Sequence, residues 1–340
     1  MIWLDYLLVI LVSVIFTLIC VRLVLRYFPK LGLMDRPEKY GYNRAAVPYS
    51  AGVILVLVFF LIALSFLPFD QKLLGLVIGA VILALVSFWD DRKGLSPYLR
   101  LFVQVFVALL VVLSGSQIFG FNLPGFGFLE LGVLGGGVAT VVWIVLVINM
   151  LNWLDGVPGL SLGVSGVGFL ALFALSVLPH FHTLPQAGVA YLSLGLGASA
   201  LVLMFFSVPK LKLLIGDTGS MFLGLMLAVL SVYAGGKVAT AVLVLALPFF
   251  DTVWTILRRI KSGVSPFKGD LNHLHHRLQR LGWSNWKICL FFIGVSTLFA
   301  FLALNFLSTE RKLFMAVVIF AMLSLLAILI VYFDGNKRRD

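Results

Sequence analysis

Long apolar runs separated by short polar segments dominate this sequence. Of its 340 residues 61% are hydrophobic and only 11% are charged, and the mean hydropathy is +1.11. An average soluble domain has about 45–50% apolar and about 25% charged residues. A soluble globular enzyme is therefore excluded, and the sequence predicts an all-α polytopic integral membrane protein.

The apolar runs supply ten or eleven transmembrane helices, since about 20 residues are needed for each span. The expected spans are 3–25, 50–67, 73–89, 98–116, 133–151, 162–178, 187–206, 220–235, 238–257, 287–307 and 313–333. The run at 220–235 is short, so ten spans is the alternative to eleven. The loops are too short for a separate soluble domain, and residues 1–340 are expected to form a single transmembrane domain.

The basic residues are distributed unevenly between the two sides. No Lys or Arg precedes the first span, whereas Arg22 lies at its end and Arg26 and Lys30 follow it, which predicts an N-terminus outside and no cleavable signal peptide. With the spans above, all but four of the 25 Lys and Arg residues share the side of the first loop. The exceptions are Lys72, Lys237, Arg311 and Lys312. Loops rich in Lys and Arg remain cytoplasmic, so this side faces the cytoplasm of the inner (plasma) membrane.

The net charge of +11 therefore reflects topology, and it suits anionic lipid head groups and phosphates at that face. No nucleic-acid partner is expected. Cys20 and Cys289 lie inside apolar runs and are predicted to be small buried hydrophobic residues. The outer segment 120–128 is rich in Gly and Phe; a hairpin is one interpretation, but we favour a membrane-surface loop with aromatic anchors. His180 and His182 lack a third ligand nearby and are expected to be solvated.

Acidic residues are scarce, 14 in all, and between the first loop and the last span six of them lie in or beside inward-facing segments: Asp90, Asp91, Asp155, Asp217, Asp251 and Asp270. A carboxylate in hydrocarbon costs about 2.5–3.5 kcal/mol on insertion scales, so each one needs a reason. Helix capping or pairing with nearby bases is one such reason, and it is the better interpretation for Asp270. Asp90 and Asp91 directly follow an apolar helix, where two adjacent carboxylates favour a divalent cation or a proton that must be taken up.

Two further polar clusters lie at the ends of apolar segments. Asn149, Asn152 and Asp155 are spaced to share one face at the end of a helix, and such a face is costly unless it lines a polar cavity. The segment Gly216-Asp217-Thr218-Gly219-Ser220 predicts a compact turn before another helix. Its N–H groups and hydroxyls suit phosphate and its carboxylate suits a hard metal, although a simple helix start is the alternative.

The fourth cluster, His273, His275, His276 and Arg277, lies in the longest inward loop. Leucines recur there at spacings of three and four, which predicts one interfacial amphipathic helix with the histidines and Arg277 toward water or ligand. These leucines are Leu271, Leu274, Leu278 and Leu281. Three histidines are compatible with zinc, but the hard oxygen ligands elsewhere on this face favour Mg²⁺ or Mn²⁺ and leave the imidazoles for phosphate.

With these four clusters in this order, the sequence resembles the polyprenyl-phosphate N-acetylhexosamine-1-phosphate transferase family. Members move a sugar-1-phosphate from a UDP-sugar onto a lipid phosphate at the inner membrane face and release UMP. The resemblance implies an active site built from cytoplasmic loops and inner helix ends. Its partners would be a UDP-N-acetylhexosamine, polyprenyl (undecaprenyl) phosphate and the lipid bilayer, and a homodimer is compatible with the family.

The resemblance also assigns roles to individual residues. Asp90 and Asp91 match an Asp-Asp motif, Asp217 matches a metal-binding aspartate, and Mg²⁺ (or Mn²⁺) is expected on Asp217 and Asp91. The expected catalytic residues are Asp90, Asp91, Asp217, His275 and His276. The expected substrate-binding residues are Arg44, Asn152, Asp155, Gly156, His273 and Arg277.

The His-x-His-His-Arg form and the segment Pro-Phe-Phe-Asp251-Thr252 look like the undecaprenyl-phosphate N-acetylglucosamine-1-phosphate transferase branch. That branch carries out the first step of a cell-envelope glycan pathway. The alternative within the family is the phospho-N-acetylmuramoyl-pentapeptide transferase of peptidoglycan synthesis. Direct attack by the lipid phosphate and a covalent aspartyl-phosphate path are both compatible with these residues.

Three positions depart from the family pattern. Pro158 replaces a second acid, Ser207 replaces an asparagine, and the glycine pair of the first loop reads Ser50-Ala51-Gly52. These departures leave open a catalytically silent relative that binds lipid phosphate. A transporter is the alternative from a different class, but it predicts acids near span midpoints and internal repeats, and this sequence shows neither.

Overall fold

The computed structural model describes residues 2–40, 44–123, 127–178, 186–234, 238–263, 273–305 and, toward the C-terminus, 311–312, 314–315, 317–322 and 324–325. Its longer helices are α1 (Ile2–Tyr27), α2 (Val53–Phe66), α3 (Gln71–Lys93), α4 (Pro97–Leu113), α5 (Gly132–Leu154), α6 (Leu160–Val177), α7 (Ala187–Ser207), α8 (Gly216–Tyr233), α10 (Ala246–Lys261) and α12 (Asn285–Asn305). Shorter elements are η1 (Pro37–Tyr40), α9 (Val238–Val244), α11 (Leu274–Arg280) and two strands, β1 (Gly120–Leu123) and β2 (Gly127–Glu130).

Within the described residues, seven helices are long and apolar enough to cross a membrane: α1, α3, α5, α6, α7, α8 and α12. The bent pair α9 and α10 makes eight if it counts as one span, and α2 and α4 are shorter apolar helices. The chain is thus a helical multi-pass membrane protein. The expected count of ten or eleven stays a prediction, because most of the last segment, 313–333, lies outside the described residues.

Local sequence signals explain where several helices begin. Asp70 precedes α3, and its carboxylate accepts a 2.7 Å hydrogen bond from the backbone N–H of Leu73. Ser96 caps α4 in the same way, and Pro97 follows at the first helical position, where its missing N–H is not needed. Both helices therefore have well-defined starts, and the start of α4 brings the first turn of that helix close to the end of α3.

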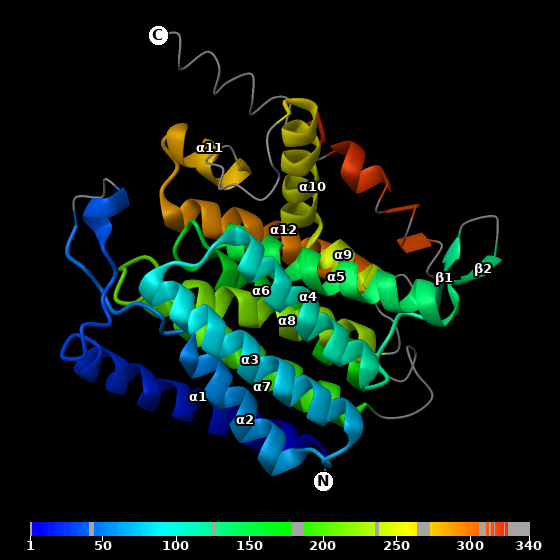
Figure 1. Ribbon diagram of the computed structural model, residues 1–340, viewed down its shortest axis with the longest axis horizontal. Coiled ribbons are helices and arrows are strands. Elements are labelled where there is room, and N and C mark those ends of the chain that lie inside the picture. Colours follow the sequence, from blue (N-terminus) through cyan, green and yellow to red (C-terminus); the bar gives the residue numbers. More distant parts are fainter. Residues whose placement is uncertain are drawn as a thin grey trace.

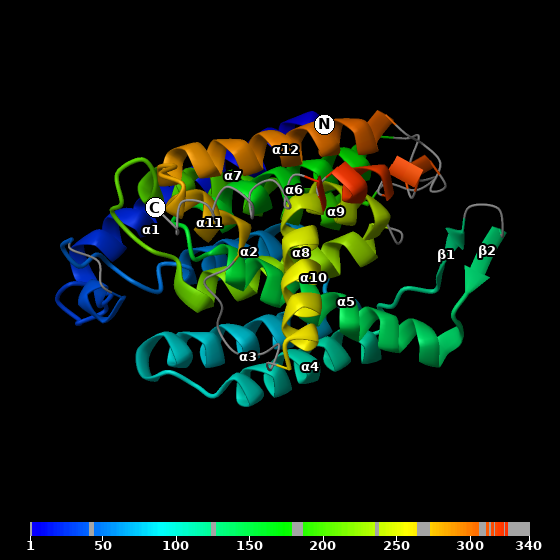
Figure 2. The same ribbon diagram turned by 90° about the horizontal axis from the view of Figure 1, so that it is seen from above.

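The long helices run roughly along one direction and share a common end (Figure 1). Helices α1, α3, α5 and α7 end on the left-hand side of that view, and α4, α6, α8 and α12 begin there; the view from above agrees (Figure 2). Helix α8 lies at the centre, and 89% of its residues are buried inside the protein. All four polar clusters of the sequence analysis lie toward this common end.

The predicted span at 238–257 is broken in the structure. Helices α9 and α10 meet at an angle of 86°, and α10 runs across the direction of the long helices (Figure 1). Pro248 explains the break, because it has no N–H for the carbonyl of Val244 and its ring clashes with that carbonyl in a continuous helix. The side of α10 that packs against the protein carries polar residues, including Asp251, Thr255 and Arg259, which are all buried.

Our preference for an irregular loop over residues 120–128 was wrong. Strands β1 and β2 form an antiparallel hairpin in which Gly120 pairs with Glu130 and Leu123 pairs with Gly127. Pairing satisfies the backbone groups of a segment that would otherwise leave them unbonded at a membrane surface. Phe119 and Phe128 are exposed there, at 64% and 60% of their surface.

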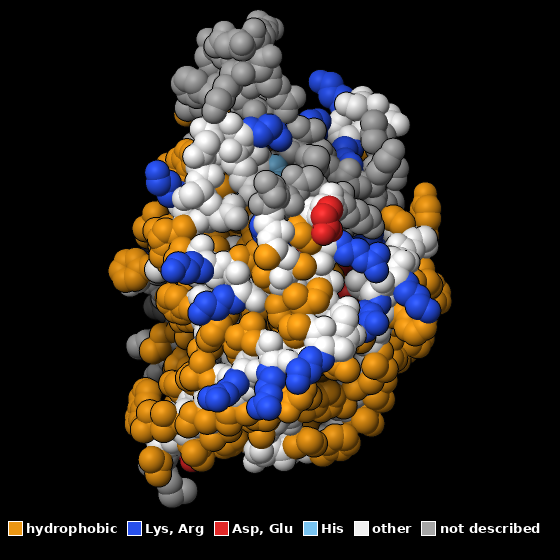
Figure 3. Space-filling view, turned by 90° about the vertical axis from the view of Figure 1, so that its left-hand side faces the viewer, with side chains coloured by type: hydrophobic (Ala, Val, Ile, Leu, Met, Phe, Trp, Pro, Cys, Tyr) orange, Lys and Arg blue, Asp and Glu red, His pale blue; other side chains and the backbone are white. Residues whose placement is uncertain are grey.

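The face at the common end carries many Lys and Arg side chains among apolar ones (Figure 3). This agrees with the grouping of basic loops on one side. Cys20 and Cys289 are both free and buried, as predicted. His180, His182 and Asp270 lie outside the described residues.

Candidate active site

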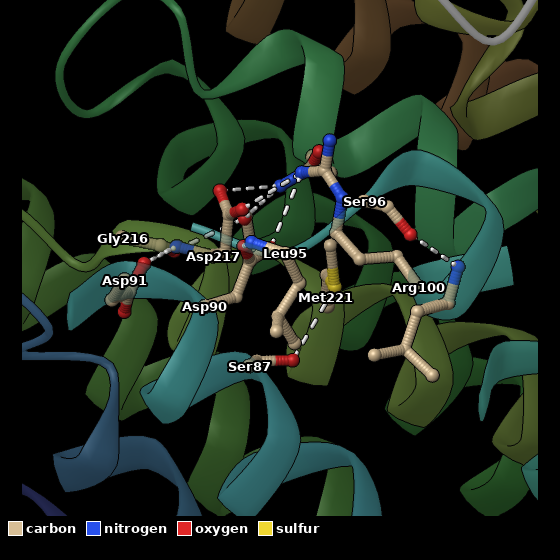
Figure 4. A network of polar contacts seen from close by, with 12 residues as sticks. Ser87, Asp90, Asp91, Leu95, Ser96, Arg100, Gly216, Asp217 and Met221 are labelled. Carbon is tan, nitrogen blue, oxygen red and sulfur yellow. Dashed lines mark hydrogen bonds and ion pairs between the residues drawn. The ribbon is translucent and has the colours of Figure 1, made fainter. Parts of the chain in front are cut away.

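Three helix ends bring two carboxylates and one guanidinium together. Asp90 lies near the end of α3, Arg100 lies in the first turn of α4, and Asp217 lies in the first turn of α8. Nη1 of Arg100 is 3.3 Å from Oδ2 of Asp90 and 3.2 Å from Oδ2 of Asp217 (Figure 4). From the sequence alone, Arg100 is only one of the basic residues on the side predicted to be cytoplasmic. Its position one turn into a helix that starts beside Asp90 was the available signal.

Asp90 has one engaged and one unbonded oxygen. Its Oδ1 accepts a hydrogen bond from the backbone N–H of Leu95. Its Oδ2 is buried and has no hydrogen-bond partner among the described residues, apart from the ion pair with Arg100. A buried carboxylate oxygen with a free lone pair is a natural ligand position.

Asp91 points to a different partner. Its Oδ1 accepts a 2.7 Å hydrogen bond from the backbone N–H of Asp217. Its Oδ2 accepts from the N–H and the hydroxyl of Thr218, at 3.2 and 2.6 Å. Asp91 thus caps the N-terminus of α8, where unpaired N–H groups and the helix dipole favour an anion. Gly216 makes this possible, because its φ is +66° and a Cβ there would lie 2.6 Å from the Asp91 carboxylate.

Asn152 joins the same centre from the last turn of α5. Its Nδ2 donates to Oδ1 of Asp217 at 2.9 Å and to the hydroxyl of Ser220 at 3.1 Å. One helical turn earlier, Asn149 donates to Gln104 of α4 at 2.6 Å. The predicted polar face of α5 therefore exists, and its amides hold α8 and α4 in place.

Asp155 follows directly after α5 and accepts a hydrogen bond from the Ser161 hydroxyl. Burial raises the pKa of the Asp155 carboxyl well above its usual range, and the negative charges of Asp217 and Asp91 act in the same direction. The Ser161 hydrogen bond opposes this rise of the pKa.

Arg44 forms an ion pair within the first loop. Its guanidinium pairs with Asp35 in the same loop, and the other oxygen of Asp35 accepts a 2.7 Å hydrogen bond from the backbone N–H of Val47. This pair orders the first loop on the way to Pro48.

The first loop is tied to the start of α8 by backbone contacts. The N–H groups of Ala51 and Gly52 donate to the carbonyls of Leu214 and Ile215, both at 3.0 Å. Gly52 approaches Gly219 so closely that a Cβ on Gly52 would lie 2.1 Å from the Gly219 Cα. Only glycine fits there, which accounts for the one glycine that this chain keeps of the expected pair.

Ser50 is a second residue that the sequence analysis did not assign. It is buried, its φ is +65°, and its hydroxyl hydrogen-bonds the carboxylate of Asp91. A left-handed backbone at a residue other than glycine costs energy. At this position the conformation delivers a hydroxyl to the acid that caps α8.

The histidine cluster lies against the end of α5. His275 is 1% exposed, and neither of its ring nitrogens has a hydrogen-bond partner among the described residues. A Cβ on Gly156 would lie 3.0 Å from Nε2 of His276 and 3.3 Å from Nε2 of His275. Burial lowers the pKa of His275 well below its usual value, and the nearby imidazole of His276 adds to this. Burial also lowers the pKa of His276.

The predicted amphipathic segment forms α11, but its leucines pack inward. Leu274 and Leu278 are buried in the main hydrophobic core, and His275 lies on the interior side as well, away from water; that it faces a ligand stays a prediction. Helix α11 packs against α12, which explains the difference. His276 and Arg277 are partly exposed, and Leu271 lies outside the described residues.

The two other departures from the family pattern have structural roles. The Pro158 carbonyl accepts a 3.6 Å hydrogen bond from the thiol of Cys289. The Ser207 hydroxyl donates to the carbonyls of Leu203 and Leu213, at 3.2 and 3.3 Å, and so anchors the end of α7. Neither side chain adds a carboxylate or an amide to the site.

A metal must be judged on the oxygen atoms available. Among the described residues, no group of three or more His, Cys, Asp or Glu side chains forms a metal cage. Mg²⁺ does not need such a cage, because it is bound through one or two carboxylates and completes its shell with water and substrate phosphates. Asp90 and Asp217, with the unbonded Oδ2 of Asp90, fit that requirement.

Comparison with known proteins shows the family of this chain. Residues 73–235 match the family described as "Glycosyl transferase family 4", and this segment contains Asp90, Arg100 and Asp217. A relative from Bacillus subtilis (strain 168), "Probable undecaprenyl-phosphate N-acetylglucosaminyl 1-phosphate transferase", is 31% identical over 285 residues, which are 81% of this chain and 77% of the relative. The chain belongs to glycosyl transferase family 4.

Two other relatives are similar over a comparable or larger share of the chain. Both are named "Undecaprenyl-phosphate alpha-N-acetylglucosaminyl 1-phosphate transferase". The protein from Salmonella typhi is 28% identical over 287 residues, which are 80% of this chain and 76% of the relative. The protein from Yersinia pestis is 29% identical over 319 residues, which are 88% of this chain and 83% of the relative.

Proposed function

We propose that this protein transfers N-acetylglucosamine-1-phosphate from UDP-N-acetylglucosamine to undecaprenyl phosphate and releases UMP. The observation that carries the proposal is the meeting of Asp90, Arg100 and Asp217 where three helices end or begin. Two carboxylates that can hold a metal ion and one guanidinium that can bind phosphate suit a reaction in which both substrates are anionic phosphates. The names of the relatives support the sugar and the lipid class.

In the proposed reaction an oxygen of the lipid phosphate attacks the phosphorus that carries the sugar. The new P–O bond forms as the bond between the two phosphates of the UDP-sugar breaks, and the electron pair leaves with UMP. Bound Mg²⁺ would neutralise the charge that develops on the phosphate oxygens. Asp217 and Asp90 would hold the ion, because the oxygens of Asp91 are engaged by the first turn of α8. Mn²⁺ is an acceptable substitute for this all-oxygen ligand set.

Other residues would bind and orient the substrates. Arg100 offers an always-charged, five-donor group to phosphate oxygens once the substrate arrives. His275 and His276 lie beside Gly156, and the two unpaired nitrogens of His275 favour a ligand that supplies hydrogen bonds there. Asn152 holds Asp217 through Oδ1, so that Oδ2 faces Arg100. Asp90 or Asp91 would accept the proton when the lipid phosphate arrives protonated.

We place this site at the cytoplasmic face of the inner membrane, with residues 1–340 as a single transmembrane domain. The support is the grouping of the basic loops at the same end as the carboxylates. Loops rich in Lys and Arg are retained in the cytoplasm. UDP-sugars are water-soluble, so this side suits the donor, while the lipid phosphate enters from the bilayer.

The donor can be tested directly. Purified protein is incubated with undecaprenyl phosphate, Mg²⁺ and either UDP-N-acetylglucosamine or UDP-N-acetylmuramoyl-pentapeptide, and the release of UMP is measured. We expect release with the first donor only. Release with the pentapeptide donor alone would move the protein to the other branch, and lipid-phosphate binding without release from any UDP-sugar would indicate the silent relative.

A further inference from the structure

Asp251, on helix α10, contacts the histidine cluster and is separate from the carboxylates Asp90, Asp91 and Asp217. Asp251 lies on the buried side of α10, about one and a half turns after the start of that helix, and is 7% exposed. Its Oδ2 lies 2.8 Å from Nδ1 of His273. Its Oδ1 accepts a 2.8 Å hydrogen bond from the backbone N–H of Leu274. One side chain therefore holds both an imidazole and the first residue of α11.

This geometry fixes the tautomer of His273. A carboxylate only accepts hydrogen bonds, so the hydrogen between the two groups must lie on Nδ1, and Nε2 is left as an acceptor when the ring is neutral. The hydroxyl of Thr255, 3.4 Å from the same Nδ1, is too distant to decide the matter. His273 is 5% exposed, so water does not compete for this contact.

The orientation of His273 is passed on to the rest of the site through ring contacts. His273 stacks on His275, with centroids 5.5 Å apart and planes within 5° of parallel. His273 also packs against Trp153, the residue after Asn152, and the centroids of these two rings are 5.5 Å apart. The ring centroids of His275 and His276 are 4.3 Å apart. A rotation of His273 would therefore disturb both α5 and the two histidines beside Gly156.

We infer that Asp251 is a positioning residue, which fixes the tautomer and ring plane of His273 and thereby presents the histidine cluster to the nucleotide-sugar phosphates. The inference rests on the proposed function for the identity of those phosphates. The 86° break is part of this arrangement, because α10, which carries Asp251, runs across the other helices and packs against α5.

Asp251→Asn tests the inference with little change of shape. The amide oxygen can still accept from Leu274 N–H, but the remaining group is then an N–H donor aimed at Nδ1, which forces the hydrogen of His273 to Nε2. We expect ¹⁵N nuclear magnetic resonance of histidine-labelled protein in liposomes at pH 8 to report Nδ1–H in the wild type and Nε2–H in the variant. The His273 signal is assigned by its loss in His273→Gln. We expect kcat for UMP release to fall about 10–100-fold, the usual effect of removing the outer partner of a functional histidine.

Asp70→Asn is the matched control. Asp70 also caps a helix through a 2.7 Å hydrogen bond, and asparagine caps equally well, but the residue lies at the opposite end of α3 from Asp90. We expect its kcat and histidine spectrum to match those of the wild type. An Nε2–H tautomer of His273 in the wild type would overturn the inference whether or not Asp251→Asn folds. So would a folded Asp251→Asn variant with unchanged tautomer and kcat. A tautomer shift in a protein that never releases UMP would instead refute only the proposed function.

Discussion

The backbone N–H of Asp217 donates a 2.7 Å hydrogen bond to the carboxylate of Asp91, whereas Asp90 faces Arg100. The adjacent residues Asp90 and Asp91 therefore have different structural roles. Asp91 fixes the position of α8, and Asp90 directs Oδ2 toward Arg100, which also pairs with Asp217. The distinction follows from their 100° separation on α3, which lets one side chain point to a neighbouring helix start and the other to the first turn of α4.

Asp91→Asn and Asp90→Asn should separate stability from activity. Asp91→Asn replaces an acceptor by an N–H donor that faces the N–H groups of α8, and it should destabilise the fold by about 1.5–3 kcal/mol. Asp90→Asn keeps the Leu95 hydrogen bond and should lower the unfolding midpoint less while abolishing UMP release. Thermal unfolding and UMP release are measured on both. Equal effects of the two variants on both quantities would refute the division.

Arg100→Gln should impair catalysis through phosphate binding. The change leaves Asp90 and Asp217 side by side without a counter-charge and removes a donor from the phosphates. Loss of a charge-assisted contact is worth about 1.5–3 kcal/mol, so we expect kcat/KM for the UDP-sugar to fall by at least about tenfold. Steady-state kinetics at saturating Mg²⁺ provide the measurement. Unchanged kinetics would show that the ion pairs of Arg100 only stabilise the empty protein.

Gly52→Ala should prevent the first loop from docking on α8. A Cβ on residue 52 would lie 2.1 Å from the Gly219 backbone, and the backbone segments at residues 52 and 219 would have to move apart. Gly294→Ala is the control, because a Cβ at this helical position meets nothing within 4 Å. Thermal unfolding should show a loss of several degrees or failure to purify for Gly52→Ala, and no loss for Gly294→Ala. A normally folded and active Gly52→Ala would contradict the contact.

Ser50→Gly and Ser50→Ala distinguish the hydroxyl from the backbone. Both remove the hydrogen bond to Asp91, but glycine adopts φ +65° readily, whereas alanine retains the strain. We expect Ser50→Gly to be more stable than Ser50→Ala by about 1 kcal/mol, the usual penalty for a left-handed non-glycine residue. Both should show the same reduced activity. An active Ser50→Gly at wild-type level would show that the hydroxyl is dispensable.

The contribution of His275 and His276 to stability should fall as the pH drops below about 6.5, the ordinary pKa of histidine. Burial lowers the pKa of both groups, so in this range the unfolded chain binds protons that the folded protein refuses. This contribution to the free energy of unfolding declines by up to about 1.4 kcal/mol per pH unit for each group, while Asp155, whose pKa is raised by burial, takes up a proton in the folded protein and acts in the opposite direction. Unfolding midpoints in detergent at pH 5.5 and 7.5 measure it. His275→Leu should reduce the difference, and an equal difference in this variant would exclude His275 as a cause.

Much of this fold follows from the apolar pattern. Predicted and observed helix limits agree within a few residues over most of the chain, because hydrocarbon thickness sets helix length. The break at Leu245 required the effect of Pro248, and the start of α8 at Gly216 rather than 220 required the cap from Asp91. Neither is a property of hydropathy.

The site was predictable as a set of residue types but not as a set of contacts. Asp90, Asp91, Asn152 and Asp217 were all chosen from sequence, and the structure brings them together. Arg100 was not, because its position one turn into the helix after Asp90 indicates a role only once the start of α8 is known to lie beside both. The separate directions of Asp90 and Asp91, and the inward position of His275, depend on which helices lie adjacent.

The central claim is transfer of a phosphosugar, and the fate of one phosphorus atom tests it. UDP-N-acetylglucosamine labelled with ³²P at the phosphate attached to the sugar is supplied with undecaprenyl phosphate and Mg²⁺, and Asp217→Asn serves as the inactive control. We predict that the wild type moves the label to the lipid and releases unlabelled UMP, while the variant does neither. Label recovered in released UDP, with unlabelled sugar on the lipid, would contradict the account, since the bond broken would then be the one between sugar and phosphate.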